Sequence, residues 1–173
     1  ADEAYNVFPQ QPSSTLPWTI PWRYIVISES PAGIFESDRV YDLADPCRMT
    51  DTSWIRPGKA SWSWWSKENS AEDYVRLARF VDFSKEMNWE YSLVDANWHK
   101  MKGGDITKLA EYGVRNNVGI LLWYNSGGKF NNYMAEPRDS MDDPVIRQRE
   151  LKRISKAGVK GIKVDFFQSD KQG

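Results

Sequence analysis

The feature that most constrains this chain is a repeated alternation of short apolar segments and amphipathic segments. The apolar segments span residues 59–65, 90–95, 118–124 and 161–164, and each is rich in residues that favour strands. Helical patterns separate them. The first runs from Ala71 to about Met87 with Ser70 as its N-cap, the second is capped by Asp105 and ends near Asn116, and the third runs from its N-cap Asp143 to Ala157. This alternation predicts successive strand-helix units, and therefore a parallel sheet.

Four such units are half of an eightfold α/β barrel, which takes about 250 residues in full. We therefore expect residues 57–173 to be the first half of a (β/α)8 TIM-type barrel, strands 1 to 4, truncated, in an α/β fragment of a longer protein. A small open sheet with helices on both faces is the alternative. Residues 1–56 have little apolar periodicity, and we expect them to be the end of an N-terminal β-sandwich domain plus a linker, with a strand at Trp22–Ile27.

Composition limits the classes of function. The formal net charge is -1, which argues against a nucleic-acid or membrane partner, and no apolar run approaches the ~20 residues of a membrane span. One Cys and one His exclude an internal disulfide and a multi-His zinc site. Nine Trp and 14% aromatic residues are unusual. Trp and Tyr faces stack on sugar rings, and they also fill cores, so both uses are open.

Polar and aromatic side chains gather where the predicted strands end, which is the active face of an α/β barrel. The residues at the four exits are Ser63, Trp64 and Trp65; Asp95, Asn97, Trp98 and His99; Tyr124, Asn125 and Lys129; and Lys163, Asp165 and Gln168. Sugars need both hydrogen-bond partners and flat apolar faces, so this combination predicts a cleft for a polyhydroxylated ligand.

Asp165 is the first candidate for chemistry, as one member of the carboxylate pair that a glycosidase needs. The alternative is that it caps a helix or fixes a loop. Asp95 is better placed to bind hydroxyls or to orient Lys163 or His99. Lys163 either lowers the pKa of Asp165 or only forms a salt bridge, and His99 either contacts a hydroxyl or only packs. Of the tryptophans, Trp62 is expected in the core, with Trp64 and Trp65 at the mouth.

Four segments together resemble glycoside hydrolase family 97. They are residues 59–65 (KASWSWW), 92–98 (SLVDANW), 119–125 (GILLWYN) and 161–167 (GIKVDFF). Residues 21–23 (PWR) and 57–59 (PGK) resemble that family's junction between a β-sandwich and a barrel. The resemblance covers nearly all of residues 17–173.

This resemblance implies an exo-acting α-glycosidase, bacterial and periplasmic or secreted, with calcium near its substrate site. Retaining α-galactosidases of the family use an aspartate at the end of the fourth strand as nucleophile, and this position is Asp165. Inverting α-glucosidases of the family lack it. The pattern Lys163-Val164-Asp165 also resembles the nucleophile motif of related α-galactosidases. The resemblance therefore favours a retaining double displacement on an α-galactoside or oligosaccharide.

The family's proton donor and calcium ligands lie outside this chain, so we expect an inactive fragment without calcium and with no metal ligand of its own. The predicted substrate-binding residues are Trp64, Trp65, Asp95, Asn97, Trp98, His99, Asn125 and Lys163. An α-glucosidase of the same family and a non-catalytic carbohydrate-binding fragment are the alternatives. Residues 1–20 lack the charged and apolar regions of a signal peptide, so we expect the signal of an exported protein to have been removed or to lie outside this chain. The open sheet edge predicts self-association of the fragment.

Overall fold

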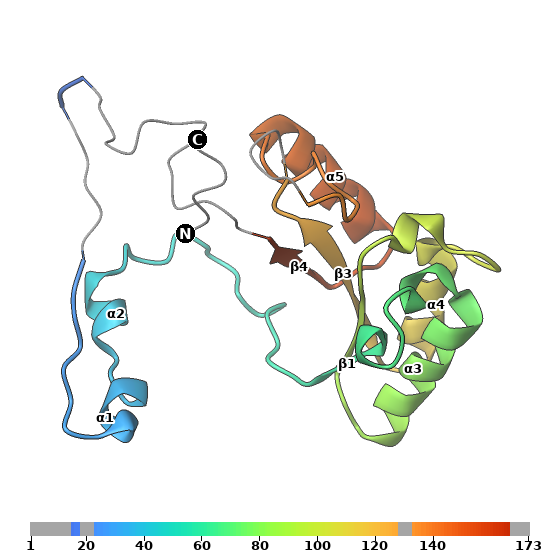
Figure 1. Cartoon of the computed structure of the whole chain (residues 1–173), viewed down its shortest axis with the longest axis horizontal. Coiled ribbons are helices and arrows are strands. Elements are labelled where there is room, and N and C mark those ends of the chain that lie inside the picture. Colours follow the sequence, from blue (N-terminus) through green and yellow to red (C-terminus); the bar gives the residue numbers. More distant parts are fainter. Residues whose placement is uncertain (1–14, 18–22, 128–132, 167–173) are drawn as a thin grey trace. The chain divides into compact units, whose positions relative to one another are not determined.

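The computed structural model describes residues 15–17, 23–127 and 133–166 (Figure 1). These residues belong to two units that divide between Arg56 and Pro57. The first unit contains two short helices, and the second contains the sheet.

The second unit is built on a four-stranded parallel sheet in the order β1-β2-β3-β4. The strands are β1 (Ala60–Trp62), β2 (Tyr91–Val94), β3 (Gly119–Asn125) and β4 (Gly161–Asp165). Strands that are consecutive in the chain are neighbours in the sheet, as successive strand-helix units require. The prediction of an α/β fold with a parallel sheet is confirmed.

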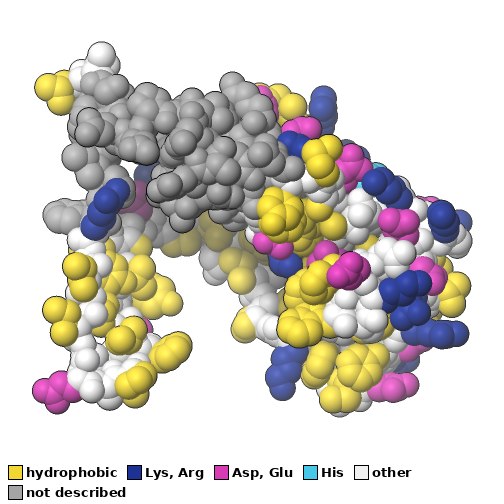
Figure 2. Space-filling model, viewed as in Figure 1, with side chains coloured by type: hydrophobic (Ala, Val, Ile, Leu, Met, Phe, Trp, Pro, Cys, Tyr) yellow, Lys and Arg dark blue, Asp and Glu magenta, His cyan; other side chains and the backbone are white. Residues whose placement is uncertain are grey.

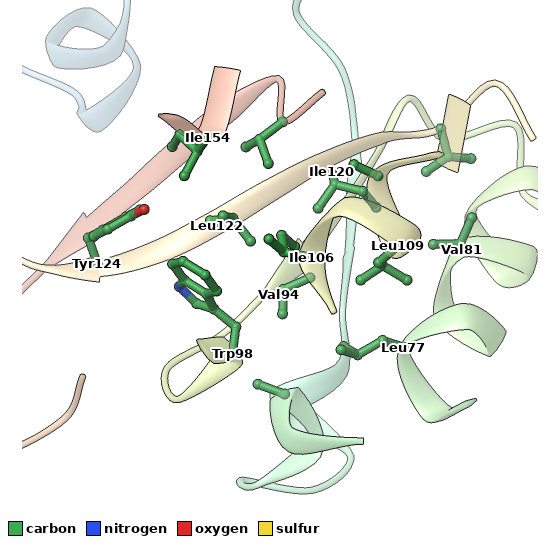
Figure 3. Packing of buried hydrophobic residues seen from close by; sticks show 14 of the residues in the cluster. Leu77, Val81, Val94, Trp98, Ile106, Leu109, Ile120, Leu122, Tyr124 and Ile154 are labelled. Atoms are coloured by element: carbon green, nitrogen blue, oxygen red, sulfur yellow. The ribbon is translucent and has the colours of Figure 1, made fainter. Parts of the chain in front are cut away.

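Helices α3 (Tyr74–Glu86), α4 (Ile106–Arg115) and α5 (Pro144–Lys156) bury side chains in one common core on one face of the sheet (Figure 3). Residues of all three helices meet alternate residues of the strands there, among them Leu77, Leu109, Ile154, Val94, Ile120, Leu122 and Tyr124. Side chains alternate across a strand, so the intervening residues face the other side. Among the described residues the core that these three helices form with the sheet lies on one face.

Local signals fix most helix ends. Asp105 Oδ1 accepts the N–H of Lys108 at 2.9 Å, and Asp143 Oδ1 accepts the N–H groups of Val145 and Ile146, so both predicted N-caps are confirmed. Gly158 ends α5 with φ of 92°, a backbone conformation that glycine adopts without strain. The first helix differs from the prediction, because its N-cap is Asp73, three residues beyond the expected Ser70.

Strand β1 is shorter than predicted. It ends at Trp62, and Ser63–Trp65 form a 3-10 turn whose carbonyls accept the N–H groups of Ser66 and Lys67. The hydroxyl of Ser63 lies 2.8 Å from that of Ser70 in the interior, and this bond satisfies two buried polar groups. Because of this turn, residues 63–65 do not continue the alternation of faces that a strand would have. The side chains of Trp62, Trp64 and Trp65 are in contact as a result.

The first unit contains helices α1 (Pro31–Phe35) and α2 (Arg39–Leu43). Its described residues include no buried side chain and no strand, and large apolar side chains are exposed along it (Figure 2), among them Ile27, Phe35 and Trp54. Arg23–Ile27 are not a strand, contrary to the prediction, because the described part of this unit offers no neighbouring strand; Trp22 lies outside the described residues. The β-sandwich tail stays a prediction.

Candidate active site

Asp95 and Asp165 lie at the carboxyl ends of β2 and β4, and Lys163 connects them. The Nζ atom of Lys163 is 3.1 Å from Oδ2 of Asp165 and 3.9 Å from Oδ2 of Asp95. Asp95 is buried, whereas the side chains of Lys163 and Asp165 are about one-third exposed, at 33% and 37%. The parallel topology therefore brings together two carboxylates that are 70 positions apart in the sequence, as predicted from their strand ends.

Each carboxylate accepts hydrogen bonds from the same two kinds of donor, a tryptophan indole and the backbone N–H of the next residue. The indole N–H of Trp62 donates to Oδ2 of Asp95 at 2.7 Å, and that of Trp123 donates to Oδ2 of Asp165 at 3.1 Å. In both cases Oδ1 accepts the backbone N–H of the next residue at 2.8 Å. Both carboxylates therefore have a fixed orientation before any ligand arrives.

The register of the sheet explains this repetition. Trp62 of β1 pairs with Leu93 of β2, and Trp123 of β3 pairs with Lys163 of β4. Each aspartate lies two residues beyond the partner of its tryptophan, so it shares the face of the sheet with that indole. Sequence analysis placed Trp62 in the core and did not select Trp123. The signal was present in the sequence as a Trp on one strand with an Asp near the end of the next.

The surroundings of Asp165 favour its ionised form. Partial burial by itself raises the pKa of Asp165. The N–H groups of Phe166 and Trp123 and the ammonium group of Lys163 lower the pKa by more, so it lies below the ordinary value for an aspartate. Asp165 is therefore a carboxylate at neutral pH, the state in which it can act as a nucleophile.

A cluster of three tryptophans meets Lys163 and Asp95 through Trp62. The ring of Trp62 stacks on Trp64 with centroids 5.4 Å apart and meets the edge of Trp65 at 5.8 Å. The ammonium group of Lys163 lies 4.1 Å from the centroid of Trp62. Trp64 is 38% exposed and Trp65 is 78% exposed, so apolar ring surface next to Trp62 is open to solvent. A sugar ring requires this combination of apolar faces and hydrogen-bond partners.

Asn97 and His99 belong to a partly exposed polar group at the end of β2. The Nε2 atom of His99 is 3.1 Å from Oε2 of Glu136, which also contacts Nζ of Lys100 at 3.0 Å. Lys100 donates to Oδ1 of Asn97 as well. Hydrogen bonding and charge from Lys100 lower the pKa of Glu136. The group therefore links the β2 exit to the loop between β3 and α5, and Glu136 is a member that sequence analysis missed.

Trp98 and Asn125 are buried parts of the scaffold. Trp98 is 4% exposed, its indole N–H donates to the carbonyl of Trp123 at 2.9 Å, and its ring lies against Tyr124 among the core side chains (Figure 3). The amide of Asn125 donates to the carbonyls of Tyr133 and Ala135, and its oxygen accepts the N–H of Gly127. These contacts position the exits of β2 and β3, and we do not retain either residue as a direct substrate contact.

Two other residues at the predicted exits, Lys129 and Gln168, lie outside the described residues. Within the described ranges, no three His, Cys, Asp or Glu side chains gather to hold a metal ion. The helices formed by the described residues lack the length and apolar character needed to cross a bilayer.

Residues 54–173 match the family model for Glycoside hydrolase 97. The chain belongs to glycoside hydrolase family 97. Among curated relatives, a retaining alpha-galactosidase of Bacteroides thetaiotaomicron is 31% identical over 172 residues, covering 90% of this chain. A probable retaining alpha-galactosidase of Streptomyces bingchenggensis is 32% identical over 165 residues, covering 88%. This family 97 chain spans about a quarter of the length of each relative, 24% in both cases.

A solved structure supports the fold. The crystal structure of a beta-arabinopyranosidase is 36% identical, with a TM-score of 0.73, over 80% of this chain and 22% of that chain. The identity and the TM-score show that the chain shares the fold of the corresponding part of that protein.

Proposed function

We propose that this chain is part of a retaining α-galactosidase in which Asp165 is the nucleophile. The observation that carries the proposal is the position of Asp165 at the end of β4, where Trp123, Lys163 and Phe166 orient it and keep it ionised. The names of the two curated relatives support the same activity. We further propose that Asp95, Lys163, Trp64 and Trp65 bind the sugar, and that Asn97 and His99 line the edge of the site.

We also propose that residues 57–173 are the first half of a (β/α)8 barrel. Sequential strand order, a wholly parallel sheet and helices on one face support this architecture. The proton donor and the calcium ligands then belong to later segments of the complete enzyme. It follows that the chain alone is inactive, since one carboxylate without its partner cannot run the reaction. Within the described ranges β4 pairs only with β3, and an unpaired edge of this kind favours self-association. We propose export for the complete enzyme.

The α-galactosidase and beta-arabinopyranosidase activities in the names of the similar proteins concern sugars with the same ring configuration. β-L-Arabinopyranosides have the configuration of α-D-galactopyranosides at the ring carbons and lack the hydroxymethyl group. The structural similarity to a beta-arabinopyranosidase therefore makes such pentosides a second candidate substrate. A site that hydrogen-bonds the axial O4 of galactose discriminates strongly against glucose, because a mismatched hydroxyl leaves buried polar groups unpaired.

The test uses the complete enzyme that contains this chain. Asp165→Gly should lower turnover of p-nitrophenyl α-galactoside by roughly 10³- to 10⁶-fold. Azide should restore turnover and yield the β-galactosyl azide, because it attacks from the face that the carboxylate vacates. Asp95→Gly is the matched control, and it should lose activity without azide rescue.

The stereochemistry of the wild-type product completes the test. Proton NMR should show α-galactose as the first product of hydrolysis. A β-product formed first, or wild-type turnover by Asp165→Gly, would return Asp165 to a structural role and would favour an inverting α-glucosidase. Faster hydrolysis of the arabinoside than of the galactoside would name the second candidate as the substrate.

A further inference from the structure

Trp123 is a rigid donor aimed at one oxygen of Asp165. Its side chain is 1% exposed, its ring meets the ring of Phe166 at 5.7 Å, and its carbonyl accepts the indole N–H of Trp98. Its indole N–H lies 3.1 Å from Oδ2 of Asp165, the oxygen that Lys163 also contacts. Among the described contacts, Oδ2 receives two side-chain donors and Oδ1 receives one backbone N–H.

We propose that Trp123 is a positioning residue that sets how fast Asp165 leaves the sugar in the second half of the reaction. The inference rests on the proposed function, in which Asp165 forms a covalent bond to the substrate. Because Oδ2 is held by Trp123 and Lys163, Oδ1 is the oxygen that bonds to the sugar.

In the first half-reaction a lone pair of Oδ1 forms the bond to the anomeric carbon while the bond to the leaving-group oxygen breaks. A carboxylic acid of the complete enzyme gives its proton to that oxygen. In the second half-reaction water attacks the anomeric carbon, and the pair of electrons of the bond to Oδ1 returns to Asp165. The water proton goes to the carboxylate that donated before, which restores both groups.

The charge on Asp165 changes in opposite directions in these two steps. Attack removes negative charge from the carboxylate, so a hydrogen bond to Oδ2 is stronger before the transition state than in it. Departure regenerates the charge, so the same hydrogen bond strengthens in the transition state and accelerates the step. Loss of the Trp123 donor should therefore slow departure and spare attack.

The experiment compares Trp123→Phe with the wild-type complete enzyme on an activated dinitrophenyl α-galactoside. The kcat should fall by about 10- to 100-fold, the range expected for one hydrogen bond to a charged group. The ratio kcat/KM should stay within a few-fold, so KM should fall with kcat. A burst of dinitrophenol should appear, and intact-protein mass spectrometry should detect the galactosyl-enzyme.

Trp62→Phe is the matched variant, because Trp62 makes the same bond to Asp95. Asp95 does not bond covalently to the sugar, so Trp62→Phe should lower kcat/KM and give no burst and no accumulated intermediate. In Trp123→Phe the burst amplitude counts folded active sites, so partial unfolding of that variant lowers the amplitude and leaves the rate constants per site unchanged.

The outcomes separate the two proposals. Equal losses of kcat and kcat/KM in Trp123→Phe without accumulation, or wild-type kinetics, would overturn the inference about Trp123 and leave the nucleophile intact. Failure of azide to rescue an inactive Asp165→Gly, or full activity of that variant, would overturn the proposed function itself.

Discussion

Lys163→Met in the complete enzyme should move the acid limb of kcat/KM to higher pH. The ammonium group is 3.1 Å from Oδ2 of Asp165, and both side chains are about one-third exposed, at 33% and 37%. Because solvent screens both charges, we use the dielectric constant of water to calculate their interaction. The attraction between unit charges at this distance is then about 1.3 kcal/mol. Its loss makes the ionised form of Asp165 less favourable.

The sign follows from the depressed pKa of Asp165. The attraction between Lys163 and ionised Asp165 is fully present at pH values above the ordinary aspartate range. It is lost as the pH falls through the lowered pKa of Asp165, because the carboxylate is then protonated. In wild type the acid limb attributable to Asp165 should therefore lie below the ordinary aspartate range. Without Lys163 the pKa of Asp165 rises, and activity should disappear at a higher pH on acidification.

The assay is a pH profile of kcat/KM, which reports ionisations of the free enzyme. Lys163→Arg is the matched control, since it keeps the positive charge and should keep the acid limb near its wild-type position. Added salt should reduce the difference between wild type and Lys163→Met, because a partly exposed pair is screened. An acid limb at an unchanged pH in Lys163→Met would refute the assignment of Lys163 as the cation that favours ionised Asp165.

Two further predictions concern the scaffold. Tyr124→Phe should lower the free energy of unfolding by about 1–3 kcal/mol in urea denaturation, because the buried hydroxyl of Tyr124 donates to Glu150 at 2.7 Å. The control Tyr112→Phe removes a more exposed hydrogen bond to Asp82 and should lower this free energy by less, and equal losses in the two variants would contradict the role of burial. Asn125→Ala removes two hydrogen bonds that the side chain of this β3 residue donates to the loop between β3 and α5. Hydrogen exchange at residues 133–137 should become faster by about 10-fold or more, and unchanged exchange would show that other contacts hold the loop.

Most of the fold followed from short-range patterns in the sequence. The strands β2, β3 and β4 and the caps Asp105 and Asp143 lie where predicted, because apolar periodicity and capping depend on residues within a few positions of each other. The end of β1 at Trp62 was not predictable in this way. It depends on the bond between Ser63 and Ser70, which exists only once the chain has turned.

The candidate site was predictable in part. Strand ends identified Asp95, Lys163 and Asp165, because parallel strands deliver their carboxyl ends to one edge. Trp98 has the same sequence context, yet it lies in the core, since the 3-10 turn after β2 directs its indole to the carbonyl of Trp123. A residue next to a strand end can face either side, and only packing decides which.

The sequence by itself determined the order of the elements, their parallel pairing and the carboxylates at their exits, because these depend on local periodicity and chain connectivity. The tertiary structure decided which tryptophan donates to which aspartate, how Lys163 reaches both, and which aromatic faces stay exposed. The two bonds from indole to carboxylate join residues more than 30 positions apart through the strand register, and the register is fixed only when the helices pack on the sheet.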